Sequence, residues 1–190
     1  YRPEGDGRPV REVSEWEIRG ASNRLILNGI NTITSYYSFS GLSDEELNRL
    51  NVWIGRCCTM LRGGRQVSDI ALLYPVDTAW VRFTPSRHWT EESPAAADRV
   101  EKTFGDAEEA LYTARRDFTH IDAQTLLDGQ VENGVLKYRD FRWRVLVLPD
   151  ADTLPLAAWE KVAVFSRSGG AVIALTSLPA NGEGEFPSAR

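Results

Sequence analysis

The chain has 190 residues and a formal net charge of -5, and 42% of its residues are hydrophobic and 26% charged, as in an ordinary soluble globular protein. This length suits one main domain with a small appendage. The negative charge without a basic stripe argues against a nucleic-acid partner, and no apolar run reaches the roughly 20 residues that span a bilayer.

The first third of the sequence predicts two helices. Residues 1–10 are rich in proline, glycine and charge, so we expect a loose lead-in. Apolar residues recur at helical spacing from about residue 11 to Leu27, and Asn28-Gly29 predicts the stop. Residues 30–36 then predict a short extended segment.

The second of these helices has a clear start signal. Ser43 and Glu46 form a capping box, and the helix that they open is expected to end at Gly63. Cys57 and Cys58 fall inside this pattern, where neighbouring side chains point about 100° apart and cannot easily bridge each other. We expect them to be buried thiols.

Three apolar runs predict strands of a parallel sheet: residues 69–75, 144–149 and 171–176. Because none of them alternates polar and apolar residues, each predicts a strand that is buried on both faces. Residues 117–122 predict a further short strand, and Asn133-Gly134 predicts a hairpin turn. Helical patterns that begin near Pro94 and Pro155 separate the runs. The expected fold is therefore α/β, an open parallel sheet with helices on both faces.

Residues 76–89 predict a long loop that is too aromatic for a simple connection. It combines flat rings with hydrogen-bond donors, and sugars are bound by such combinations. The alternative, which we weigh equally, is that the rings pack the loop onto its own domain or a neighbouring one. The residues concerned are Trp80, Arg82, Phe83, Arg87, His88 and Trp89.

Ligands of open parallel sheets bind at the carboxyl ends of the strands. Those ends offer Tyr74, Asp77, Asp122, Asp150 and Thr176. Our first interpretation is that the aspartates cap helices and start turns, and the alternative is a carboxylate pair across one gap.

Recognised catalytic and cofactor motifs are missing from the sequence. No strand is followed by a nucleophile elbow, a dinucleotide fingerprint or a phosphate loop. The two histidines, His88 and His120, are too few and too separated to predict a metal site. We therefore predict no catalytic residue, no metal and no cofactor.

Six segments together resemble a known family: residues 29–37, 51–56, 69–75, 117–122, 138–149 and 169–175. They are similar to the carboxyl-terminal part of large bacterial glycoside hydrolases of the α-L-rhamnosidase type, and beyond them to β-galactosidases with a trimerisation domain. The resemblance spans roughly residues 20–179 and rests on strand and turn patterns rather than catalytic signatures. One departure is Thr119-His120, where relatives often carry an acidic-aromatic pair.

The resemblance implies a flavodoxin-like, class I glutamine-amidotransferase-like domain that has lost the amidotransferase cysteine. The family's catalytic acids lie in an upstream barrel and match no position of this chain. Residues 1–62 would be a helical segment that resembles the end of that barrel, residues 63–180 the α/β domain, and residues 181–190 a tail. The absence of an initiator methionine leads us to expect a piece of a longer polypeptide.

The barrel interpretation makes one structural prediction. Six residues of the first third should include side chains that are meant for a missing neighbour, and these would be exposed or buried against another copy of the chain. The six residues are Trp16, Leu25, Ile33, Tyr36, Tyr37 and Trp53.

The function that we expect is that of an accessory, non-catalytic domain of a multidomain glycoside hydrolase. It would pack on the catalytic barrel of its parent polypeptide and contribute to carbohydrate binding or homo-oligomerisation. One alternative is a stand-alone hydrolase that uses Asp77, Asp122 or Asp150 as general acid or base. The other is an assembly module with a large apolar patch. Neither nucleic acid nor membrane is expected as a partner, and a periplasmic or secreted location as part of a longer enzyme stays open.

Overall fold

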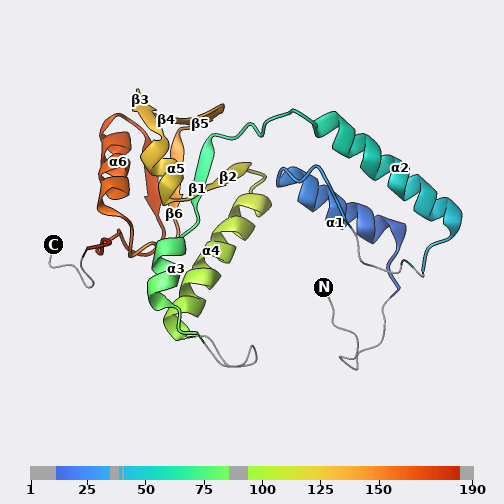
Figure 1. Ribbon diagram of the computed structural model, residues 1–190, viewed down its shortest axis with the longest axis horizontal. Helices are drawn as coiled ribbons and strands as arrows, with labels where there is room; N and C mark the ends of the chain where they lie inside the picture. The colour runs from blue at the N-terminus through green and yellow to red at the C-terminus, as the bar shows by residue number, and fades with distance from the viewer. Residues whose placement is uncertain (1–11, 35–38, 40, 86–93, 185–190) are drawn as a thin grey trace. The chain divides into compact units, whose positions relative to one another are not determined.

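The computed structural model describes residues 12–34, 39, 41–85 and 94–184. The chain divides into two compact units, residues 1–66 and residues 67–190. Among the described residues, the first unit holds two helices and the second holds all the strands (Figure 1).

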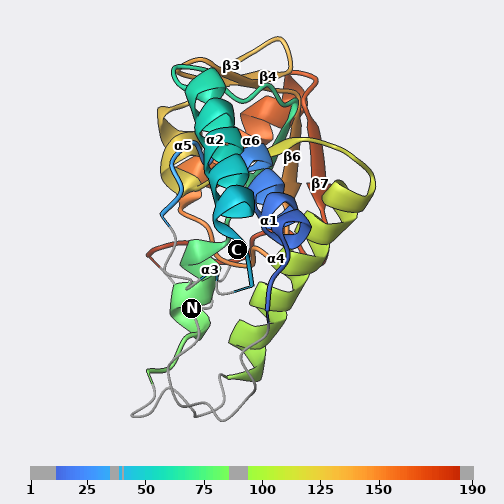
Figure 2. The same cartoon turned by 90° about the vertical axis from the view of Figure 1, so that its right-hand side faces the viewer.

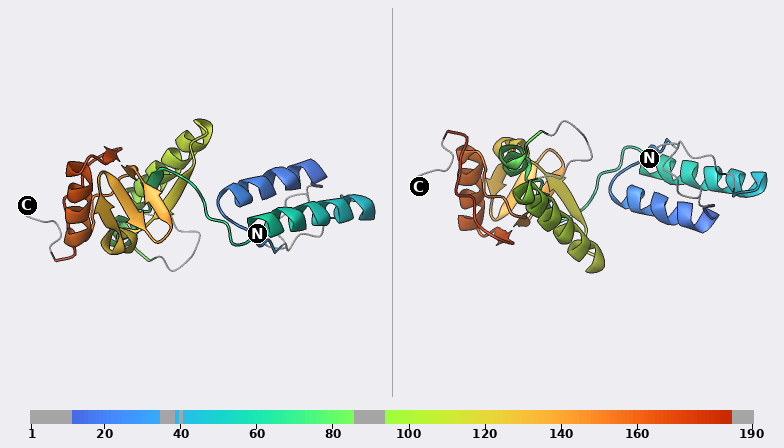
Figure 3. Two further views of the ribbon diagram at one scale, coloured as in Figure 1. Left: turned by 90° about the horizontal axis from the view of Figure 1, so that it is seen from above. Right: turned by 90° about the horizontal axis from the view of Figure 1, so that it is seen from below.

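The first unit is a pair of helices, α1 (Glu15–Leu27) and α2 (Asp44–Leu61), which lie side by side (Figures 1 and 3). The predicted capping box of Ser43 is confirmed. Ser14 makes a second capping box at the start of α1, which the sequence analysis did not identify. Both predicted helix ends are also confirmed, with left-handed glycines after them.

The helix pair buries few of its side chains. Within the described part of this unit only Ser22 and Leu50 are buried. Trp16 is 80% exposed and Leu25 is also exposed, while Ile33 and Trp53 are half-buried. The expectation that these side chains would not all be buried within the chain is confirmed for these four, and Tyr36 and Tyr37 lie outside the described residues.

Residues 30–34, the described part of the predicted extended segment, belong to no helix and no sheet, so their extended conformation stays a prediction. One prediction for the first unit was wrong. Cys57 and Cys58 are free and half-buried rather than buried, because the thin core between the helices does not reach far enough to enclose them.

The second unit is built on a four-stranded parallel sheet in the order β2-β1-β6-β7. Its strands are β1 (Ile70–Leu73), β2 (Phe118–Ile121), β6 (Val145–Leu148) and β7 (Ala171–Ala174). The chain moves from β1 to β2 on one side and later to β6 on the other, so the strand order reverses between β1 and β6. The predicted flavodoxin-like open sheet, preceded by helices, is confirmed.

Helices cover both faces of this sheet (Figure 2). α5 (Ala123–Asp128) and α6 (Leu156–Arg167) pack on the face that carries Leu73, Leu146 and Leu148. α4 (Ala95–Thr113) packs on the opposite face, against Leu72, Phe118 and Val147. Apolar residues at alternate positions of one strand thus enter two different cores, which explains why the strand sequences are continuously apolar.

A second, antiparallel sheet has the order β3-β4-β5 and consists of β3 (Gln130–Glu132), β4 (Val135–Tyr138) and β5 (Phe141–Trp143). Asn133 (φ 50) and Gly134 (φ 73) form the predicted hairpin turn. The third strand was not predicted. Its Trp143 is 1% exposed and belongs to the same core as α5 and α6, so it joins the small sheet to the main one.

Two predictions for the second unit were wrong. Residues 76–82 form the helix α3 (Val76–Arg82) rather than a loop, because tertiary hydrogen bonds fix this segment. β7 is not buried on both faces, because it is an edge strand and α4 packs on the other three strands. At the start of the expected tail, Asn181 bridges to Thr153 and the Glu183 carboxylate accepts a hydrogen bond from the Leu156 amide at 2.8 Å, and the tail itself stays a prediction.

Candidate functional site

The carboxyl ends of the parallel strands gather most of the residues singled out in the sequence. Tyr74 and Asp77 follow β1, Asp122 follows β2, Asp150 follows β6 and Thr176 follows β7. The reversal of strand order between β1 and β6 makes this edge the place where an open sheet binds ligands. We call it the strand-end site.

Asp150 is the most enclosed acid of the strand-end site. Its side chain is 2% exposed and its backbone has a φ of 44°. The Oδ2 atom accepts a hydrogen bond from Arg99 Nε of α4 at 2.7 Å, and Oδ1 accepts one from Thr176 Oγ1 at 2.7 Å. Burial alone would raise the pKa of Asp150, but these two donors outweigh burial and hold the pKa below its ordinary value. The carboxylate therefore links β6, α4 and the segment after β7.

Asp152 and its neighbour Thr153 fasten α3 to the loop after β6. The guanidinium of Arg82 pairs with the Asp152 carboxylate, which also accepts a hydrogen bond from Thr153 Oγ1 at 2.8 Å. The buried Thr78 hydroxyl donates to the Thr153 carbonyl and accepts from the Thr153 amide, each at 3.0 Å. These bonds explain why a segment with weak helical pattern forms a helix here.

Asp122 caps the helix that follows β2. Its Oδ1 atom accepts hydrogen bonds from the Thr125 hydroxyl at 2.6 Å and the Thr125 amide at 2.7 Å. The Thr125 hydroxyl is the main cause of a pKa below the ordinary value for Asp122, followed by the opposing effect of burial and then by the Thr125 amide. The interpretation of this aspartate as a helix cap is confirmed.

Asp77 differs from these acids. Burial raises the pKa of its half-buried carboxyl, and the negative charges of Asp122 and Glu183 raise it further, against the lowering effect of its own backbone amide. Asp77 is therefore the acid of this edge whose charged form the fold disfavours.

Replacing Asp77 by asparagine is expected to raise the free energy of unfolding at neutral pH. Since the folded state raises this pKa, the folded chain holds the proton more tightly than the unfolded chain, and stability is lost as the pH rises through the folded pKa. Urea unfolding at about pH 4 and about pH 7 should show the gain of the variant growing with pH.

Asp122→Asn is the matched control, because the pKa of Asp122 is lowered and its ionised form is stabilising. That variant should lose stability at neutral pH. Equal losses of unfolding free energy in both variants would contradict the opposite pKa shifts of the two carboxyls.

The aromatic residues near the site divide into two kinds. Tyr74 packs edge-on against Phe104 of α4, with ring centroids 5.1 Å apart. Trp80 is 74% exposed, and Phe83 is also exposed, so neither ring is buried within its own unit, and packing on a neighbouring domain stays a prediction. Arg87, His88 and Trp89 lie outside the described residues. Contact of the strand-end residues with a substrate stays a prediction.

Sequence reasoning missed Arg99, Asp152, Thr78 and Thr153. The chain separates Arg99 from Asp150 by 51 positions and Thr78 from Thr153 by 75, and no local pattern links them. In the part of the chain that the structure describes, no group of acids, histidines and cysteines could hold a metal ion. No helix of that part is long and apolar enough to cross a membrane.

Comparisons with known proteins show similarity to solved structures. No protein-family model matches the chain, and no curated protein matches it. Among solved structures, the chain is similar to a β-galactosidase from Bifidobacterium adolescentis, with 19% sequence identity and a TM-score of 0.44. The match covers 63% of this chain and 46% of that one, so the chain spans less than half the length of that structure.

Proposed function

We propose that the chain is an accessory, non-catalytic α/β domain of a multidomain glycoside hydrolase. The observation that carries this proposal is the engagement of Asp122, Asp150 and Asp152 by donors of their own unit. A general acid or base must exchange a proton with its substrate. A carboxylate that holds helices and loops together through such donors serves the fold instead. The resemblance in the strand and turn segments supplies the class of enzyme.

The exposed face of α3 provides a surface for such a domain. Trp80, Val81 and Phe83 are all exposed beside the strand-end site. Neighbouring exposed apolar side chains mark interaction surfaces more often than isolated ones do. We assign this face to contact with the catalytic barrel and the carbohydrate that it holds.

One observation favours a second candidate, a hydrolase that uses Asp77. Its pKa is raised by burial and by the charge of Asp122, and two carboxyls with opposite pKa shifts are the arrangement by which glycosidases separate acid from nucleophile or base. In this candidate Asp77 is the general acid.

Turnover of a panel of aryl glycosides by the 190-residue chain separates the two candidates. For the accessory domain we expect no release of the aryl group above the buffer rate, and the same result for Asp77→Asn. Robust turnover by the unsubstituted 190-residue chain would overturn the accessory proposal. If Asp77→Asn then abolished that turnover, the second candidate would replace it.

A further inference from the structure

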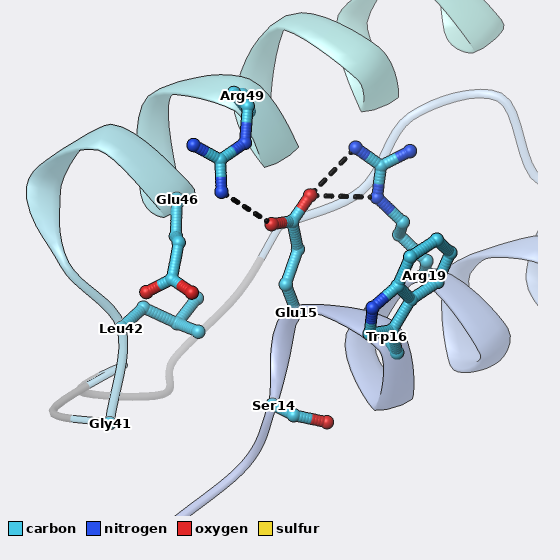
Figure 4. A pocket seen from close by; sticks show the side chains of 8 residues that line it. All are labelled: Ser14, Glu15, Trp16, Arg19, Gly41, Leu42, Glu46 and Arg49. Atoms are coloured by element: carbon cyan, nitrogen blue, oxygen red, sulfur yellow. Dashed lines mark hydrogen bonds and ion pairs between the residues drawn. The ribbon is translucent and has the colours of Figure 1, made fainter.

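The helix pair of the first unit holds a hollow that is unrelated to the strand-end site (Figure 4). Its volume is about 490 Å³, within the range of about 300–1,000 Å³ that is usual for small-molecule sites. Ser14, Glu15, Trp16 and Arg19 line it from the start of α1. Gly41, Leu42, Glu46 and Arg49 line it from the start of α2.

The charges that line the hollow are balanced. Glu15 Oε1 accepts hydrogen bonds from Arg19 Nε at 2.9 Å and Nη2 at 2.7 Å, and Oε2 accepts one from Arg49 Nη2 at 3.1 Å. The bonds from Arg19 are the main cause of a pKa below the ordinary value for Glu15. Bonds from the Ser43 amide and hydroxyl likewise lower the pKa of Glu46. Two carboxylates therefore face two guanidiniums.

Donors and acceptors remain available in this balanced hollow. Arg49 gives only Nη2 to Glu15, and Glu46 uses only Oε2 in its capping box. Among the residues that the structure describes, Arg49 Nε and Nη1 and Glu46 Oε1 have no hydrogen-bond partner. A ligand that both accepts and donates hydrogen bonds would satisfy both side chains.

Trp16 adds an apolar face to the hollow. Its ring is 80% exposed, and the Arg19 guanidinium lies 5.8 Å from the ring centroid and 4.8 Å from that of Trp53. The Arg19 contacts fix the surroundings of the ring but leave most of its surface to solvent. A large exposed ring beside spare polar atoms suits a ligand with one C–H face and several hydroxyl groups.

The charge balance decides between classes of ligand. An anion would compete with Glu15 for both arginines, and a cation would compete with the arginines for Glu15. A neutral polyhydroxylated ligand disturbs neither pair. We propose that this hollow binds one unit of a neutral sugar, with its C–H face on Trp16 and its hydroxyl groups bonded to Arg49 and Glu46.

This proposal goes beyond the accessory function and does not depend on it. The hollow belongs to residues 1–66, whereas the strand-end acids belong to residues 67–190. Sugar binding by the first unit would stand even if the second unit turned over aryl glycosides, and binding is measured without turnover.

The test is fluorine NMR of the full 190-residue chain labelled with 5-fluorotryptophan. The chain has six tryptophans, and the Trp16 signal is the one that disappears in Trp16→Phe. Titration with neutral monosaccharides, such as glucose, galactose and rhamnose, should shift the Trp16 signal saturably for at least one of them. We expect a dissociation constant on the order of 1 mM, and no shift of the Trp80 signal.

Matched variants test whether the sugar binds in this hollow. Binding to each variant is measured by ligand-observed saturation-transfer NMR. Trp16→Ala should weaken it about tenfold, whereas Trp80→Ala, which removes a similarly exposed ring of the second unit, should leave it unchanged. Glu46→Gln should also weaken it, although glutamine can still complete the capping box. Circular dichroism checks that each variant keeps its helices.

Three results would each overturn the proposal. The first is that no neutral sugar gives a saturable shift of Trp16. The second is that Trp16→Ala binds as tightly as the parent chain. The third is that inorganic phosphate binds the hollow more tightly than any neutral sugar, which would make it an anion site.

Discussion

Replacing Asp150 by alanine is expected to lower the free energy of unfolding of the α/β unit by about 3 kcal/mol. The variant loses the buried acceptor of Arg99 and Thr176. It also places alanine at a φ of 44°. Because the alanine side chain cannot hydrogen-bond to the neighbouring backbone, this left-handed conformation costs about 1 kcal/mol or more. Urea unfolding of the full chain, followed by circular dichroism, measures the change.

The pH dependence of this effect has a defined sign. Because the folded state lowers the pKa of Asp150, its stabilisation is complete above the unfolded value near 3.8 and is lost as the pH falls through the folded pKa. The cost of Asp150→Ala should therefore shrink in acid.

The control compares two cations of α4. Arg99→Met removes the partner of the buried Asp150, whereas Lys102→Met removes an exposed pair with Asp106, whose contribution should be within about 0.5 kcal/mol of zero. A change of less than about 0.5 kcal/mol for Asp150→Ala would contradict its role as a link between elements.

Trp143→Ala is expected to be the most destabilising substitution, with a loss of about 3–5 kcal/mol. Trp143 is 1% exposed, and its ring stacks on Phe141 at 5.4 Å. Alanine would leave a large cavity where the small sheet meets the core that is shared with α5 and α6. The same urea unfolding experiment measures the loss.

Trp143→Phe separates ring packing from hydrogen bonding. The buried Trp143 Nε1 atom has no hydrogen-bond partner among the described residues, so phenylalanine gives up ring volume but no bond. The variant should lose less than about half of what Trp143→Ala loses. Equal losses of stability for both variants would contradict the claim that packing of the Trp143 ring holds the two sheets together.

Local signals in the sequence predicted much of the fold. Asn133-Gly134 specifies a turn with two positive φ angles, and Ser43 with Glu46 specifies a helix start, so each needs only its neighbours. The continuous apolar runs correctly predicted parallel strands. Helices cover both faces of β1 and β6, so apolar side chains are needed at every position of these strands. The same rule overstated the burial of β7, because an apolar run does not show whether a strand lies at the edge.

The candidate sites depend on contacts that the sequence does not display. Asp150 was identified from its place after a strand, but its partners come from α4 and from the segment after β7. α3 was missed because the hydrogen bonds that fix Thr78 are made with Thr153. Thr78 follows β1 and Thr153 follows β6, so the bonds cross the place where the strand order reverses. The Ser14 capping box could have been read from the sequence, and it marks the end of α1 at which the hollow lies.

The role of the strand-end acids is tested most directly by the titration of their side-chain carboxyl carbons by NMR in the full chain. If these acids serve the fold, Asp122 and Asp150 should titrate below 3.8, and Asp77 should titrate in a single step that is independent of Asp122. The opposite result would be an Asp150 that titrates above 3.8, or an Asp77 and Asp122 that share two coupled steps as a catalytic pair does. Either outcome would contradict a non-catalytic role for this edge of the sheet.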